Sequence, residues 1–160
     1  MNIINTHLLN LLSKQAAASE RLRINHNFHA SNESKSQRLL NALEPGTVIP
    51  LHKHENTAET YIVLRGSIRV DFYHSADSIA ESAVIDPLEG NYGIDIPAGQ
   101  LHTLEVLKNG TVIFECKDGP YIPLVQPIPE NDTKLTNTDS SQKDNNPRMM
   151  VDDLNNPSFF

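Results

Sequence analysis

The sequence predicts an all-β fold, an antiparallel sandwich or barrel. Many short stretches rich in β-branched and aromatic residues alternate apolar with polar side chains, as half-buried strands do. Turn signals separate these stretches, among them Asn109-Gly110, the favoured pair for a tight hairpin. Helical patterns are missing between the stretches, which favours an antiparallel arrangement over an α/β fold.

The chain is expected to begin with an amphipathic helix that packs on the barrel. Leucines between positions 8 and 12 give the helix one apolar face, and Asn5 can cap its first turn. A basic region does not precede this run, which argues against a secretory signal, and the run is far shorter than the ~20 apolar residues that span a bilayer. We therefore assign residues 1–20 to this helical segment and expect a cytoplasmic protein without a membrane partner.

The hydrophobic period changes to two at Arg21, so polar side chains share one face of a strand. This set comprises Arg21, Arg23, Asn25, Asn27 and His29. One interpretation is an edge strand whose charges discourage aggregation. The alternative is a ligand-binding face on which the guanidiniums bind a carboxylate or phosphate, the amides bind sugar hydroxyls and His29 carries a proton.

The remaining elements complete one domain over residues 21–125. Strands are expected at 38–43, 60–65, 67–73, 83–86, 92–96, 102–107 and 111–117, with a polar connection at 75–82. The polar composition after Pro123 predicts a flexible tail over residues 126–160. A length of 160 residues fits one core, and the single cysteine, Cys116, excludes an internal disulfide.

Charge limits the classes of partner. The formal net charge of −7 and the pI of about 5.4 argue against a nucleic-acid partner, because phosphate binding needs a concentrated basic surface. We expect a small-molecule ligand instead.

Three histidines and a glutamate are spaced as metal ligands. His52 and His54 would point the same way on a strand, Glu59 would follow on the returning strand, and His102 follows a Pro-Ala-Gly turn. Each histidine alone could be an ordinary core residue, but the joint pattern favours a metal. Imidazoles with one carboxylate suit iron, manganese, nickel, cobalt or zinc rather than calcium or magnesium. The sequence therefore predicts a divalent transition metal with open positions for water or substrate.

These motifs resemble those of a known family. Residues 46–66 resemble the first motif of the cupins, and residues 97–102 resemble the centre of the second. The likeness implies an antiparallel double-stranded β-helix, the jelly roll. More narrowly, residues 21–29, 37–46 and 114–123 resemble the WbuC family of bacterial cupin-fold metalloproteins. That resemblance implies a context in surface-polysaccharide assembly, and the cupin likeness implies a homodimer.

The expected function is that of a metal-dependent cupin acting on a small polar molecule, a sugar or sugar nucleotide, as an isomerase or epimerase. Candidates for proton transfer are His29, Tyr61 and Lys117, because Tyr61 shares a strand face with Glu59 and Lys117 lies on the closing segment. Tyr121 is a further candidate for substrate binding. Two alternatives stay open: an iron-dependent dioxygenase, and a binding module that uses its metal to hold a sugar or another small ligand.

Overall fold

The computed structural model describes residues 1–122, and the predicted flexible tail at 126–160 lies outside them. One helix, α1 (Thr6–Ala18), precedes the strands. The strands are β1 (Arg23–Asn27), β2 (Ser36–Leu43), β3 (Glu59–Arg65), β4 (Ile68–Ser75), β5 (Ser78–Ile85), β6 (Gly93–Ile96), β7 (Leu101–Val106) and β8 (Thr111–Asp118), with the 3-10 helix η1 (Pro87–Glu89) between β5 and β6. In the described part of the chain, the helices are all too short or too polar to cross a membrane.

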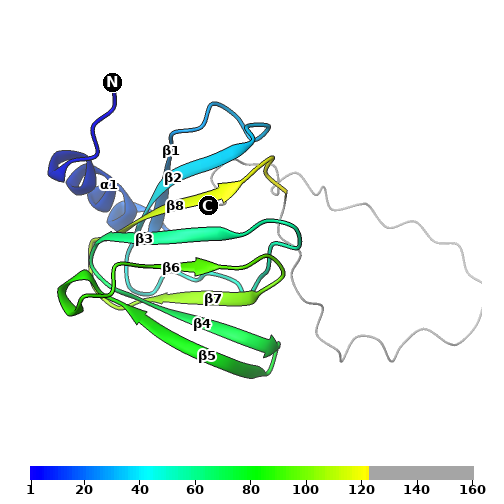
Figure 1. Cartoon of the computed structure of the whole chain (residues 1–160). Helices are drawn as coiled ribbons and strands as arrows, with labels where there is room; N and C mark the ends of the chain where they lie inside the picture. The colour runs from blue at the N-terminus through cyan, green and yellow to red at the C-terminus, as the bar shows by residue number, and fades with distance from the viewer. Residues whose placement is uncertain (123–160) are drawn as a thin grey trace, which may run out of the picture.

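The strands form two antiparallel sheets (Figure 1). The larger sheet has the order β1-β2-β8-β3-β6, and the smaller has the order β5-β4-β7. This arrangement confirms the predicted all-β antiparallel class. Strand β8 lies between β2 and β3, so Lys117 stands opposite both Gln37 on β2 and Glu59 on β3. Side chains in such a row share one face of the sheet.

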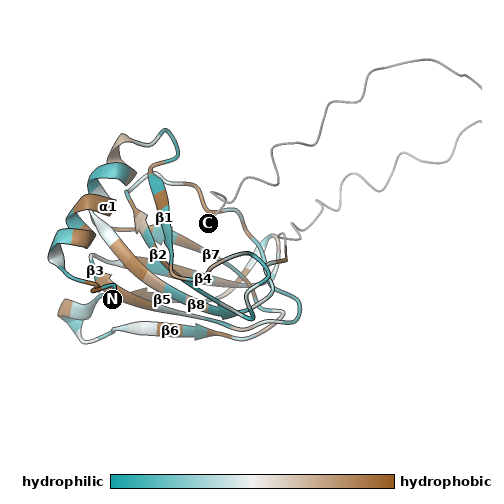
Figure 2. Ribbon diagram, turned by 90° about the horizontal axis from the view of Figure 1, so that it is seen from above, coloured by the Kyte–Doolittle hydropathy of each residue, from teal (hydrophilic) through white to brown (hydrophobic). Residues whose placement is uncertain are grey.

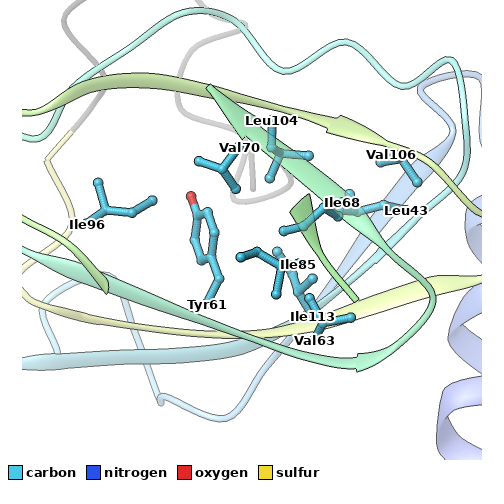
Figure 3. Packing of buried hydrophobic residues seen from close by; sticks show 10 residues of the cluster. All are labelled: Leu43, Tyr61, Val63, Ile68, Val70, Ile85, Ile96, Leu104, Val106 and Ile113. Carbon is cyan, nitrogen blue, oxygen red and sulfur yellow. The ribbon is translucent and has the colours of Figure 1, made fainter. Parts of the chain in front are cut away.

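An apolar core fills the space between the sheets. Both sheets contribute to it, and Figure 3 shows its members pointing toward one another from facing strands. The cluster comprises Leu43, Tyr61, Val63, Ile68, Val70, Ile85, Ile96, Leu104, Val106 and Ile113. Tyr61 brings the one polar atom of this cluster into it, and its position on β3 is two residues from Glu59. The core therefore continues directly into polar side chains at one end.

Helix α1 covers the opposite face of the larger sheet, and Figure 2 shows it lying to one side of the strands. Its Leu12 and Ala16 are buried against Leu40 and Val112, which alternate with the inward-facing residues of β2 and β8. Asn5 caps the helix, since its side-chain oxygen accepts a hydrogen bond of 3.0 Å from the backbone N–H of Leu8.

The glycine that ends the first motif is required by close packing. Gly66 has a φ of +84°, which favours glycine, and a Cβ built on it would lie 2.1 Å from the Thr111 hydroxyl oxygen. The backbone of β3 can therefore turn into β4 directly beside β8 only without a side chain at this position.

Two local expectations were wrong. Residues 78–82, expected in a polar connection, belong to strand β5, which lies at the edge of the smaller sheet and is mostly exposed. This strand is defined by its backbone pairing with β4. Its sequence therefore shows no regular alternation of apolar and polar residues. His52 and His54 do not lie on a regular strand, since their segment forms isolated bridges, among them the one between His52 and His102.

Candidate metal centre

Backbone hydrogen bonds bring the two motifs together. The N–H of His52 donates to the carbonyl of His102 at 3.0 Å, and the N–H of His102 donates to the carbonyl of His52 at 2.8 Å. The turn before β7 is fixed to the same segment, because the N–H of Gly99 donates to the carbonyl of His54 at 2.7 Å. The main chain alone therefore places the histidines of both motifs side by side.

The donor atoms of three predicted ligands converge. One ligand atom each from His52, Glu59 and His102 lies within 4.8 Å of the others, and all three residues are buried. The shortest contact joins His102 Nε2 to Glu59 Oε1 at 2.8 Å. This spacing lets one ion bind all three atoms.

His54 lies at the edge of this group. Its Nε2 is 3.4 Å from Glu59 Oε1, and its ring centroid is 5.4 Å from that of His52. Its side chain is 9% exposed, against 2% for Glu59 and for His102. The structure thus brings together all four predicted ligands, with His54 as the one nearest to solvent.

Backbone carbonyls orient two of the imidazoles. The carbonyl of Pro50 lies 2.8 Å from His52 Nδ1, and the carbonyl of Gln100 lies 2.8 Å from His102 Nδ1. A carbonyl oxygen can only accept, so each Nδ1 carries a proton and each Nε2 is the nitrogen that would bind an ion once it has no proton of its own. Such a hydrogen bond from the non-ligating nitrogen is usual for metal-bound histidine.

Burial and neighbouring charges keep these groups in the protonation states that bind a metal. Burial, with the nearby His102, lowers the pKa of His52 to about 4. Burial, with the charge of Lys117, lowers the pKa of His54 to about 4. Burial raises the pKa of Glu59, but the hydrogen bond with His102 and the charge of Lys117 outweigh it and lower the value to about 2. His52 and His54 are therefore neutral and Glu59 is ionised near pH 7.

A buried ion pair adjoins the ligands. Lys117 Nζ lies 3.0 Å from Glu115 Oε1, and both side chains are almost fully buried. The other carboxylate oxygen of Glu115 accepts a hydrogen bond of 2.6 Å from Asn41 Nδ2. Burial lowers the pKa of Lys117, but the charges of Glu115 and Glu59 raise it above its usual value, so the ammonium stays charged.

Sequence reasoning identified Lys117 but missed Glu115 and Asn41. The alternation of side chains along β8 could have identified Glu115, because Ile113 must face the core and Glu115 and Lys117 follow it on the same face. A charged residue at an inward position predicts a buried partner. The position of Asn41 could not be inferred, since it depends on the pairing of β2 with β8.

The two predicted tyrosines lie near this ion pair. Burial, together with the charges of Glu59 and Glu115, raises the pKa of Tyr61 well above 10, and its phenol is hydrogen-bonded with Glu59. Burial raises the pKa of Tyr121, and the positive charge of Lys117 opposes this effect. Tyr121 is fixed to the β1–β2 connection, since its N–H donates to the carbonyl of Asn32 at 2.7 Å.

The polar face of β1 points to the same side of the sheet but extends away from the ligands. Asn25 stands opposite Asn41 on β2, whereas Asn27 is exposed. Arg23 stands opposite Leu43, which pairs with Thr111, six residues from Lys117 along β8. That separation is about 20 Å at the rise of a strand.

The guanidiniums at that end of the sheet lie close to each other. Arg23 donates to the carbonyl of Val48, and burial together with the charge of Arg21 lowers its pKa to about 10. His29 lies beyond the other end of β1, where its Nδ1 is 3.1 Å from both the N–H and the carbonyl oxygen of Arg38. The structure thus groups Tyr61, Lys117 and Tyr121 around the ligands, and not Arg23.

The donor set fits a divalent transition metal. Imidazole nitrogens aligned by carbonyl hydrogen bonds, with one carboxylate, match the preferences of iron, manganese, nickel, cobalt and zinc, and four protein ligands leave positions open in a six-coordinate ion. The residues that would hold it are His52, His54, Glu59 and His102.

Comparison with solved structures identifies the fold. TT1209 from Thermus thermophilus matches with a TM-score of 0.54 and 19% identity, over 74% of this chain and 97% of that chain. BH2720 from Bacillus halodurans matches with a TM-score of 0.52 and 18% identity, over 77% and 85%. The cupin domain of Schizosaccharomyces pombe Cnp3 matches with a TM-score of 0.50 and 10% identity, over 62% of this chain and 66% of that chain, just under two thirds of its length.

These likenesses show the cupin fold. A search of curated proteins found no match. The family model described as "Domain of unknown function (DUF6016)" matches residues 4–85, which carry the helix, the first motif and the first five strands. The chain therefore belongs to the DUF6016 family and has the fold of the cupin superfamily.

Proposed function

We propose that this protein is a metal-dependent cupin that binds a small sugar or sugar nucleotide at its ion and isomerises or epimerises it. One observation carries the proposal: buried donor atoms of His52, Glu59 and His102 converge within 4.8 Å, with His54 beside them. A bound divalent ion would supply Lewis-acid stabilisation of negative charge on a substrate oxygen.

Groups that can hold a proton lie beside these ligands. Tyr61 is hydrogen-bonded with Glu59, and Lys117 faces Glu59 across β3 and β8. Both belong to the buried interior, where water competes little for a proton. This placement supports Tyr61 and Lys117 in proton transfer. His29, whose Nδ1 contacts the backbone of Arg38 beyond the end of β1, is the third candidate.

The sugar context rests on the resemblance to the WbuC family and its link with surface-polysaccharide assembly. A sugar nucleotide offers hydroxyls for the ion and for Asn25 and Asn27, and phosphates for the guanidiniums of Arg21 and Arg23.

The WbuC resemblance supports a bacterial protein, the cupin likeness supports a homodimer, and the single cysteine fits a reducing compartment such as the cytoplasm. Sedimentation of the purified full chain tests the oligomeric state directly, and a monomer at micromolar concentration would contradict this part of the proposal.

Metal binding is tested first. The full chain is purified without chelators, and its bound metals are measured for the parent, for His54→Ala and for His74→Ala, which changes an exposed histidine of β4. We expect about one transition-metal ion per chain in the parent and in His74→Ala, and a marked loss in His54→Ala. An empty parent that cannot be loaded would overturn the proposal.

Turnover is tested on the loaded protein. Sugar nucleotides and small hydroxy acids are screened by ligand-induced thermal stabilisation, and each ligand is then incubated in air and under argon with product analysis by NMR and mass spectrometry. An isomer of unchanged mass in both atmospheres supports the proposal. A product that forms only in air and contains added oxygen identifies a dioxygenase, and tight binding without a product identifies a binding module.

A further inference from the structure

The charges buried around the metal-binding side chains determine which small molecule the site can bind. Three imidazoles bind a metal as neutral groups, so the formal charges of the cluster come from Glu59, Glu115 and Lys117. When a divalent ion is bound, the two carboxylates cancel its charge, and the charge of the Lys117 ammonium remains as the net charge. The buried cluster then carries one net positive charge.

A net charge in a buried cluster is costly unless an opposite charge accompanies it. Arg21 and Arg23 do not offset this charge, because they are themselves positive, and the backbone row of Arg23 lies about 20 Å along the sheet from that of Lys117. The chain as a whole is negative, with a formal charge of −7, so its overall field does not draw anions to the site. An anion would bind for a local reason only.

We propose that the metal centre takes a monoanionic ligand, the carboxylate of a hydroxy acid or sugar acid, and that Lys117 supplies the matching charge. This inference rests on the proposed metal function and narrows its substrate class. The carboxylate and a neighbouring hydroxyl would bind the ion, and the ammonium would stabilise the remaining negative charge.

The structure holds Lys117 in place for this role. Its Cα is the register partner of Glu59, so the two side chains leave adjacent positions on one face of the sheet, with Cβ atoms about 5 Å apart. Glu115 binds the ammonium at 3.0 Å, and Asn41 binds Glu115 at 2.6 Å, which fixes the carboxylate from the neighbouring strand. We assign Glu115 and Asn41 as positioning residues for Lys117.

Two substitutions change the charge in opposite directions. Lys117→Met removes the positive charge and leaves the loaded cluster neutral. Glu115→Gln removes a negative charge, raises the net charge to two and keeps an amide of the same shape beside Lys117 and Asn41. If Lys117 and Glu115 had a purely structural role, both variants would bind the carboxylate more weakly. The charge balance predicts instead that the affinity falls in Lys117→Met and rises in Glu115→Gln.

The experiment uses the full chain loaded with Co(II), whose visible spectrum reports its coordination. Glycolate, a hydroxycarboxylate, is titrated into the parent and both variants, with ethylene glycol as the neutral control. We expect glycolate to perturb the spectrum of the parent and ethylene glycol to have little effect. Affinity for glycolate should fall about tenfold or more in Lys117→Met and rise several-fold in Glu115→Gln.

Each other outcome is decisive. Failure of the parent to bind Co(II) would overturn the proposed function itself. Co(II) binding with no response to glycolate, or equal losses in both variants, would leave the metal centre intact and overturn this inference alone. If Lys117→Met does not fold, as judged by circular dichroism, the sign of the change in Glu115→Gln decides.

Discussion

Tyr61 shows how one buried side chain connects the apolar core to the metal ligands. Its ring packs with Val70 and Ile96 in the core, and its phenol is hydrogen-bonded with Glu59. The raised pKa of Tyr61 keeps the phenol protonated, so it donates to the carboxylate. Groups that hold a metal-binding carboxylate in this way affect metal affinity without touching the ion.

Tyr61→Phe should therefore weaken metal binding by about tenfold while keeping the ring in the core. The affinity is measured by competition with a chromophoric chelator. Tyr73→Phe is the matched control, since Tyr73 lies on β4 outside the core cluster. An affinity in Tyr61→Phe equal to that of the control would show that the hydrogen bond does not support Glu59.

At this scale the sequence predicted the ligands better than their surroundings. The structure brings donor atoms of His52, Glu59 and His102 within 4.8 Å of one another, with His54 beside them, and a spacing that suits one ion can be recognised from the sequence alone. The pair formed by Glu115 and Asn41 depends instead on which residues of β2 and β8 stand next to each other. Register between strands far apart in sequence has no short-range signature, so this pair could not be found.

At the scale of elements, α1 combines a local cap with packing on the sheet. Asn5 accepts a hydrogen bond from Leu8, while Leu12 and Ala16 are buried against β2 and β8. Because α1 buries apolar side chains against the larger sheet, its stability bears on the whole fold.

Asn5→Ala should lower the free energy of unfolding by about 1 kcal/mol, because one backbone N–H of the first turn loses its acceptor. Asn5→Gly should cost only a few tenths of a kcal/mol, since glycine is tolerated at this position. Urea denaturation of the three proteins measures the difference. Equal losses in the two variants would show that the cap contributes nothing specific.

Helix η1 offers a pH-dependent contact far from the metal ligands. Asp86 accepts hydrogen bonds from Lys108 Nζ at 2.6 Å and from the N–H of Leu88 at 3.0 Å. The hydrogen bond with Lys108, and then that with Leu88, lowers the pKa of Asp86 below its ordinary 3.8. A carboxyl whose pKa is lower in the folded state stabilises the fold above its unfolded pKa, and this contribution is lost as the pH falls through the folded pKa.

Asp86→Asn keeps an acceptor for Leu88 but removes the charge that faces Lys108. The variant should be less stable than the parent near neutral pH, and the difference should shrink as the pH falls below 3.8. Urea midpoints measured across this range test the expectation. Lys108→Met should show the same pH dependence, and a difference that grows at low pH would contradict the assignment.

Strands with one buried face and one exposed face could be predicted from the sequence, whereas β5 could not. Strand β4 alternates because its apolar side chains enter the core, but β5 is exposed along most of its length and is joined to β4 by its backbone and by a side-chain hydrogen bond from Ser82 to Asp71. The segment of His52 and His54 also departed from expectation. Its position comes from two hydrogen bonds with His102 rather than from strand propensity.

At the scale of the whole molecule, the metal ligands come from both sheets. Glu59 begins β3 in the larger sheet, His102 lies on β7 in the smaller sheet, and His52 comes from the connection between β2 and β3. A bound ion would therefore join elements that are otherwise held together by the apolar core and by the bridge between His52 and His102. Unfolding would separate the ligands and release the ion.

Metal binding should consequently stabilise the entire fold. At a free metal concentration of about 100 times the dissociation constant, the free energy of unfolding should rise by about 2.7 kcal/mol. For a domain of this size that corresponds to a rise in Tm of about 8 °C, which excess chelator should reverse. Differential scanning calorimetry of stripped and reloaded protein measures both effects.

His102→Ala should lose the metal-dependent rise in Tm, whereas His74→Ala, an exposed position on β4, should keep it. A rise in His102→Ala as large as in the parent would place the ion at other residues, because no ion held between the two sheets could keep its affinity without the ligand from β7.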